Sequence, residues 1–233
     1  MYTVKVNDIS LAYRAWGPEN APPVLLLHSR GADGADWTAV AERLAEGPGA
    51  RRVYAPDLRG HGRSERLGDA PGAYAVQAMR DDVRALIAAL AAAPVDVVGH
   101  SLGGIVAYLL AQEYPDVVRR LVLEDVPAPF PFDPPRPATG RPEGELSFDW
   151  ALVPATDAQM NTPDPAWWER MGAIPAPTLV VSGGPASHVP QDRVEAVAAR
   201  IPGARLVRVD AGHLVHGTRP AEFLAAVEPF LAG

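Results

Sequence analysis

The chain has 233 residues and no cysteine, and its 28 acidic and 21 basic side chains give a formal net charge of -7. The lack of cysteine excludes disulfides, thiolate metal sites and a cysteine nucleophile. The acidic balance argues against nucleic acid or an anionic membrane as the main partner. No secretion signal and no membrane-spanning stretch is recognised. We expect a cytoplasmic protein that acts on a small molecule as a monomer or homodimer.

Apolar runs alternate with helical patterns along most of the chain. Two short strands are predicted within 2–16, and further strands at 24–27, 52–55, 95–98, 121–123, 178–181 and 205–209. Helices are predicted at 36–45, 75–93, 102–113, near 190–200 and at 219–231. Strands that alternate with helices form a parallel sheet covered on both faces. The prediction is one α/β domain over residues 1–233, with a mostly parallel eight-stranded sheet flanked by helices.

The alternation breaks where prolines and aromatic residues crowd the chain. Ten prolines fall between residues 127 and 165, a density that excludes a regular helix or a central strand there. Long loops in compact domains are usually functional. We therefore predict a short Pro- and aromatic-rich lid, inserted at about 127–172, over an active site. The alternative is a loop that packs its own aromatic side chains.

A serine lies in the segment Gly99-His100-Ser101-Leu102-Gly103, between an apolar strand and a helix. This strand, turn and helix context is typical of a nucleophile elbow. The turn is so sharp that side chains at the flanking glycines would collide. The helix that follows offers free N–H groups and its positive end to developing negative charge. The sequence predicts Ser101 as a nucleophile.

Three further segments, together with the elbow, resemble motifs of the α/β-hydrolase superfamily over nearly the whole chain. Residues 26–31 resemble its oxyanion loop, 57–64 its Asp-x-Arg-Gly-x-Gly-x-Ser loop and 210–213 its Gly-His loop. The resemblance implies an α/β-hydrolase fold and an oxyanion hole made by the backbone N–H groups of Arg30 and Leu102. It also implies His213 as the general base, for which His188 is the one serious rival.

The acid of the catalytic triad departs from this family pattern. Most members place an Asp in the loop after the strand at 178–182, where this chain has Ala186. Some related hydrolases, such as haloalkane dehalogenases, place the acid after the strand before the lid. That position holds Glu124 and Asp125, and alternation along the strand favours Asp125 as the group that orients His213. Glu124, Asp192 and a Ser–His dyad without an acid remain the alternatives.

The predicted chemistry is hydrolysis of a small, partly apolar carboxylic ester or lactone through an acyl-enzyme. Neither a cofactor nor a metal is predicted, because phosphate loops, dinucleotide loops and metal-ligand spacings are absent from the sequence. Two alternatives stay open. One is a C–C bond hydrolase, a cofactor-free lyase or a biosynthetic cyclase on the same fold, and the other is a non-catalytic or slow-turnover ligand receptor.

Candidate substrate-binding side chains are Arg30, Trp150, Trp168 and His188. Arg30 has two interpretations, because its side chain either meets an anionic substrate group or points to solvent and pairs with Asp33 or Asp36.

Overall fold

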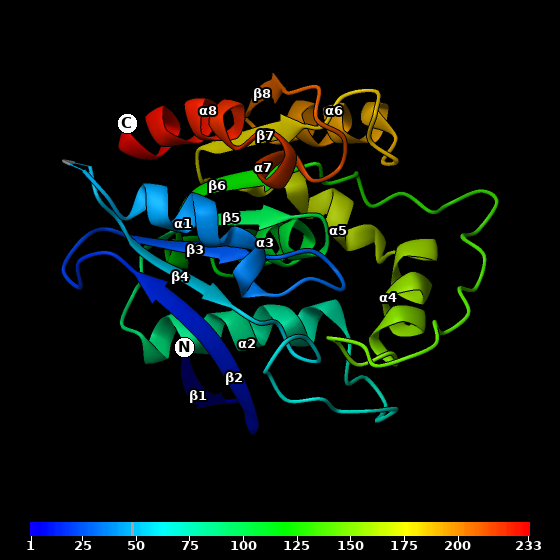
Figure 1. The fold of residues 1–233 in the computed structure, drawn as a ribbon. Helices are drawn as coiled ribbons and strands as arrows, with labels where there is room; N and C mark the ends of the chain where they lie inside the picture. Colours follow the sequence, from blue (N-terminus) through cyan, green and yellow to red (C-terminus); the bar gives the residue numbers. More distant parts are fainter. Residues whose placement is uncertain (48) are drawn as a thin grey trace.

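The computed structural model describes residues 1–47 and 49–233, and its centre is an eight-stranded sheet of order β1-β2-β4-β3-β5-β6-β7-β8 (Figure 1). The strands are β1 (Tyr2–Val6), β2 (Ile9–Trp16), β3 (Pro23–Leu27), β4 (Arg52–Pro56), β5 (Val95–His100), β6 (Val118–Glu124), β7 (Thr178–Ser182) and β8 (Arg205–Arg208). Among the strand pairs of this sheet in the described residues, only β1–β2 and β2–β4 are antiparallel. The predicted mostly parallel sheet is confirmed.

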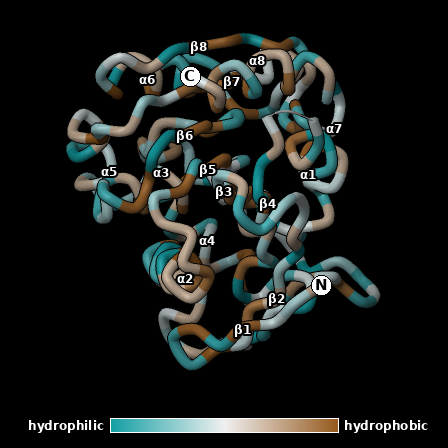
Figure 2. Tube along the Cα trace, turned by 90° about the vertical axis from the view of Figure 1, so that its left-hand side faces the viewer, coloured by the Kyte–Doolittle hydropathy of each residue, from teal (hydrophilic) through white to brown (hydrophobic). Residues whose placement is uncertain are grey.

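Helices cover both faces of this sheet. They are α1 (Thr38–Leu44), α2 (Val76–Ala89), α3 (Leu102–Glu113), α6 (Gln191–Arg200), α7 (Val215–Thr218) and α8 (Pro220–Ala232), with 3₁₀ turns at Gly34–Trp37 and Pro115–Val117. Successive residues of β5 face opposite sides, as a buried strand requires: Val97 packs in the core under α2, α3 and α6, and Val98 in the core under α1 and α8. Figure 2 shows hydrophobic segments gathered on the central strands.

No helix of the described chain is both long enough and apolar enough to cross a bilayer.

The connection between β6 and β7, residues 125–177, is the one long departure from the alternating pattern in the described chain. It contains α4 (Leu152–Asn161), α5 (Pro165–Glu169) and a 3₁₀ turn at Arg170–Ala173, and it stands to the right of the sheet in Figure 1. The helix α4 corrects the expectation that 127–165 holds no regular helix. Its Pro154 lies in the first turn, where a residue needs no intrahelical N–H bond.

Hydrogen bonds fasten this connection to the segment that follows β4. The side chain of Gln159 on α4 accepts from the Val76 N–H at 2.9 Å and donates to the Tyr74 carbonyl at 3.0 Å. The Asp149 carboxylate accepts from the Tyr74 hydroxyl at 2.7 Å and from the Gly68 N–H at 2.8 Å. The connection therefore has a fixed position beside Ser101 and the carboxyl ends of the central strands.

Candidate active site

Ser101 occupies a strained turn between β5 and α3. Its backbone angles are φ 51° and ψ −115°, and its N–H donates to the Glu124 carbonyl at 3.1 Å, which ties the turn to β6. A Cβ at Gly99 would lie 2.5 Å from the Gly103 carbonyl oxygen, and a Cβ at Gly103 would lie 2.3 Å from that of Leu27. The turn requires glycine on both sides of the serine, as the sequence motif predicts.

His213, in the loop between β8 and α7, is hydrogen bonded to Asp125. The distance from Nδ1 to Asp125 Oδ2 is 2.7 Å. The fully buried carboxylate also accepts from the Ser187 hydroxyl at 2.5 Å, the Gly183 N–H at 2.9 Å and the Gln191 amide at 3.1 Å. Burial opposes its charge, but these bonds, that of His213 first, hold the pKa of Asp125 below its ordinary value. An ionised Asp125 can only accept, so the proton of this bond lies on His213 Nδ1.

The other candidate acids lie elsewhere. Both carboxylate oxygens of Glu124 bind His216. Oε1 accepts from the His216 backbone N–H at 2.8 Å, and Oε2 lies 2.7 Å from the His216 ring Nδ1. Asp192 is exposed in the first turn of α6. Of the candidates weighed from the sequence, the structure brings Asp125 to His213.

A cavity of about 220 Å³ brings the candidate residues together. Ser101 and His213 both line it, and so do Arg30 and Leu102. Across residues 1–47 and 49–233, neither the Arg30 nor the Leu102 backbone N–H has a hydrogen-bond acceptor. Two free N–H groups beside a nucleophile are what an oxyanion hole requires.

Buried His28 fixes the loop that carries Arg30. Its Nδ1 lies 2.7 Å from the Ser29 carbonyl, and its Nε2 accepts from the Leu58 N–H at 2.9 Å. Burial lowers the pKa of His28 to about 4, so the ring is neutral and carries its proton on Nδ1. These hydrogen bonds of His28 order the loop that carries Arg30.

The Arg30 side chain binds α4. Its Nη1 donates to the Asp157 carboxylate at 2.6 Å and to the Thr156 hydroxyl at 3.1 Å. The alternative of pairing with Asp33 or Asp36 is wrong, because Asp33 lies 3.3 Å from Arg14 and Asp36 lies 3.5 Å from His216.

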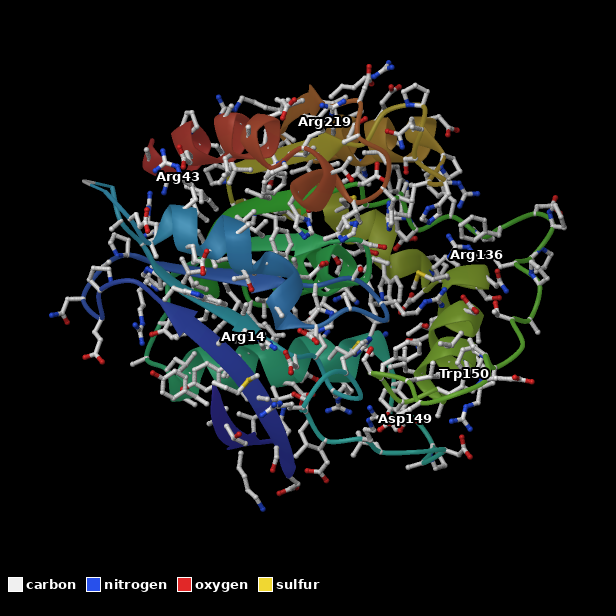
Figure 3. The ribbon with its side chains drawn as sticks, in the orientation of Figure 1. Arg14, Arg43, Arg136, Asp149, Trp150 and Arg219 are labelled. Atoms are coloured by element: carbon white, nitrogen blue, oxygen red, sulfur yellow. The ribbon has the colours of Figure 1, made fainter. Side chains whose placement is uncertain are left out.

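Of the other three candidate substrate contacts, only His188 lines the cavity. Its ring centroid is 4.2 Å from that of His213, and burial together with the neighbouring His213 lowers the pKa of His188. Trp150 and Trp168 do not line the cavity, contrary to the expectation that they contact the substrate. Trp168 packs edge-on against Phe130 at 4.6 Å, and Trp150 lies beside Asp149 at the foot of the connection (Figure 3). Their rings are used in packing away from the cavity.

A second buried carboxylate–imidazole pair, Glu124 with His216, was not expected from the sequence. The His216 ring stacks on Trp37 at 3.7 Å and lies 3.5 Å from Asp36. Burial opposes the charge of His216, but the Glu124 and Asp36 carboxylates raise its pKa to about 9. The sequence offers one signal for this second pair. Two adjacent acids, Glu124 and Asp125, accompany two histidines three residues apart, His213 and His216, and each acid bonds one histidine.

Nitrogen and oxygen atoms of His100, Glu124 and His216 lie within 4.8 Å of one another, close enough to consider a metal ion. A ligating histidine must be neutral, and the raised pKa of His216 opposes this. His100 Nε2 already lies 2.8 Å from the His213 carbonyl. The donor set fits a buried ion pair better than a metal centre.

This ion pair predicts a dependence of stability on alkaline pH. Because the folded-state pKa of His216, about 9, exceeds its ordinary value of 6.5, its contribution is complete below pH 6.5 and is lost as pH rises through 9. The expected loss in the free energy of unfolding is about 3 kcal/mol. Glu124→Gln should remove most of this slope and cost about 3 kcal/mol at pH 7, because buried His216 loses the carboxylate that keeps its ring protonated in the folded protein.

Urea unfolding followed by tryptophan fluorescence at pH 6, 7.5 and 9 measures both effects. The matched control is Glu113→Gln, which removes an exposed carboxylate 2.7 Å from Arg170 and should cost about 0.5 kcal/mol or less. A wild-type stability that stays constant from pH 6.5 to 9 contradicts the ion pair.

The chain resembles known proteins along most of its length. A family model described as alpha/beta hydrolase fold matches residues 22–147, more than half of the chain. An sn-1-specific diacylglycerol lipase of Mus musculus is 27% identical over 93% of this chain and 83% of its own length. The magnesium-chelatase 30 kDa subunit of Rhodobacter capsulatus is 32% identical over 86% of this chain and 83% of its own length.

Among solved structures, the enol-lactonase of Burkholderia xenovorans LB400 superimposes with a TM-score of 0.84 at 24% identity, over 100% of both chains. This likeness concerns the fold. Together with the family match over the elbow and the oxyanion loop, it shows that the chain belongs to the α/β-hydrolase family and is an enzyme of that family.

Proposed function

We propose that the protein is a serine hydrolase that cleaves a small, partly apolar carboxylic ester or lactone through an acyl-enzyme. The observation that carries the proposal is the 2.7 Å bond between His213 and Asp125, on a histidine that shares a cavity with Ser101. A carboxylate behind Nδ1 leaves Nε2 free to accept the proton of a serine hydroxyl.

In the proposed reaction, Ser101 Oγ attacks the substrate carbonyl carbon and His213 Nε2 takes its proton. The backbone N–H groups of Arg30 and Leu102 donate to the carbonyl oxygen as it becomes an oxyanion. His213 returns the proton to the leaving alcohol, and the acyl group stays on Ser101. Water then attacks this ester with His213 as base, which releases the acid and restores the serine.

The walls of the cavity support a small and partly apolar substrate. Leu102, Ile105 and Val189 contribute apolar surface, and the volume of about 220 Å³ is below that of pockets for drug-sized ligands. We propose that the β6–β7 connection acts as a lid, since its Thr156 and Met160 complete the wall. The lipase relative is named for hydrolysis of an ester, which supports the same bond type here.

Turnover of p-nitrophenyl acetate, butyrate and decanoate tests this proposal. We expect kcat/KM for the butyrate to exceed that for the decanoate by about tenfold or more, because a ten-carbon chain should extend beyond a cavity of about 220 Å³. Folded protein that hydrolyses none of the three contradicts the ester hydrolase and favours a ligand receptor or another chemistry. Fastest turnover of the decanoate contradicts the assigned substrate size.

A further inference from the structure

Two arginines from distant parts of the chain face the cavity that contains Ser101. Arg30 comes from the loop after β3, and Arg136 comes from the β6–β7 connection, where Figure 3 labels it. Arg30 is paired with Asp157 at 2.6 Å. Among residues 1–47 and 49–233, no carboxylate lies within 4.0 Å of the Arg136 guanidinium. The Arg136 guanidinium lies over the ring of Phe132, 4.1 Å from the ring centroid. The cavity therefore has two positive groups and one negative partner.

The position of Arg136 is fixed by its backbone. Its N–H donates to the Asn161 side chain at 2.8 Å, and its carbonyl accepts from the same amide at 3.2 Å. This pair of bonds ties the residue to the end of α4. The stacking on Phe132 occupies one face of the guanidinium and leaves the N–H groups at its edge available. An arginine held in this way presents a planar fork of donors to whatever enters the cavity.

The electrostatic setting of Arg136 favours an anion. Partial burial and the positive charge of Arg30 both lower the pKa of Arg136, and Asp157 offsets this only in part. The formal net charge of the whole chain is -7, so this positive region is a local feature of the cavity and not a general property of the surface. An anionic ligand group would relieve both the desolvation and the repulsion.

We propose that Arg136 binds a carboxylate of the substrate, so that the preferred substrate is an ester or lactone that also carries a free carboxylate. The inference rests on the proposed hydrolase function. It names a carboxylate and not a phosphate, because one uncompensated positive charge matches a monoanion. A phosphate monoester carries close to two negative charges at neutral pH. Arg30 retains Asp157 and supplies its backbone N–H to the oxyanion.

Two esters with the same number of acyl carbons test the inference: mono-p-nitrophenyl glutarate, which ends in a carboxylate, and p-nitrophenyl valerate, which ends in a methyl group. The quantity measured is the ratio of kcat/KM for the glutarate to kcat/KM for the valerate. We expect Arg136→Gln to lower this ratio by about 10- to 100-fold, the range of a charge-assisted hydrogen bond. Arg136→Lys, which keeps the charge and loses the fork, should give an intermediate ratio.

The matched control is Arg193→Gln. Arg193 also stacks on Phe132, at 4.5 Å, but donates to the carbonyls of Phe130 and Pro131 and does not line the cavity. Its substitution should leave the ratio within about twofold of the wild type, a margin well below the effect of losing one charged hydrogen bond.

Calorimetric binding of glutarate to wild type and Arg136→Gln tests the carboxylate contact without turnover. We expect the variant to bind glutarate about tenfold or more weakly. An unchanged ratio and unchanged glutarate binding in Arg136→Gln overturn the inference while the hydrolase stands. Absence of turnover for both esters in the wild type overturns the proposed function instead, and glutarate binding then decides the contact by itself.

Discussion

Replacing Ser101 by alanine is expected to lower kcat for p-nitrophenyl butyrate by at least about 10⁴-fold. The substitution removes the hydroxyl that forms the acyl-enzyme in the proposed reaction. It leaves the turn itself in place, since the Ser101 N–H bond to the Glu124 carbonyl belongs to the backbone. Steady-state kinetics measure the effect, and a thermal melt shows that the variant is folded.

Covalent labelling gives this prediction a second readout. A fluorophosphonate probe should add to the wild type and fail to add to Ser101→Ala, as read from the intact mass. Ser29→Ala is the matched control, because Ser29 is a second serine in the wall of the same cavity. The Ser29→Ala protein should still be labelled by the probe, at Ser101. Retention of a tenth of the activity in Ser101→Ala, or labelling of that variant, contradicts the assigned nucleophile.

Replacing Asp125 by asparagine is expected to lower kcat by about 10⁴-fold. Oδ2 of Asp125 lies 2.7 Å from His213 Nδ1, and Oδ1 accepts from the Gly183 N–H at 2.9 Å. In asparagine one of these two positions becomes an NH₂ group, and the Gly183 N–H still requires an oxygen at its own position. The amide NH₂ must then face His213 and donate to Nδ1. This places the imidazole proton on Nε2, which can no longer accept the proton of Ser101.

Ester kinetics of Asp125→Asn beside Asp192→Asn separate the two candidate acids. Asp192 is exposed at the start of α6, and its substitution should leave kcat within about twofold, as expected for a surface change away from the site. Activity within tenfold of wild type in Asp125→Asn would mean that His213 works without this acid, as in the Ser–His dyad considered above.

The parts of the site that the sequence predicts well are those set by local geometry. The elbow is an example, because the close approach of Gly99 to Gly103 involves residues four positions apart. The position of Asp125 follows from a backbone turn and not from the strand alternation by which the sequence favours it. It lies just beyond β6 at φ 49°, and this left-handed turn, with its N–H bonded to the Val181 carbonyl at 2.8 Å, replaces simple strand alternation.

Features that depend on distant residues were not predictable in this way. Glu124 and His216 are 92 positions apart, and only the assembled sheet places them in contact. The prolines of the β6–β7 connection suggested no helix, yet one proline in a first turn is compatible with α4. Composition also does not say which way a side chain faces. Trp150 and Trp168 pack away from the cavity, whereas Arg136, which lies in no sequence motif, lines it.

The contact between Arg30 and Asp157 has a consequence for the speed of ligand exchange. In the proposed reaction Arg30 donates its backbone N–H to the reacting carbonyl, and its guanidinium lies 2.6 Å from the Asp157 carboxylate on α4. Any outward movement of α4 that widens the entrance must stretch this ion pair and therefore pulls on the loop that shapes the oxyanion site. With the connection as the proposed lid and Arg30 as a proposed oxyanion donor, we expect a weaker contact to speed product release and to loosen the donor loop together.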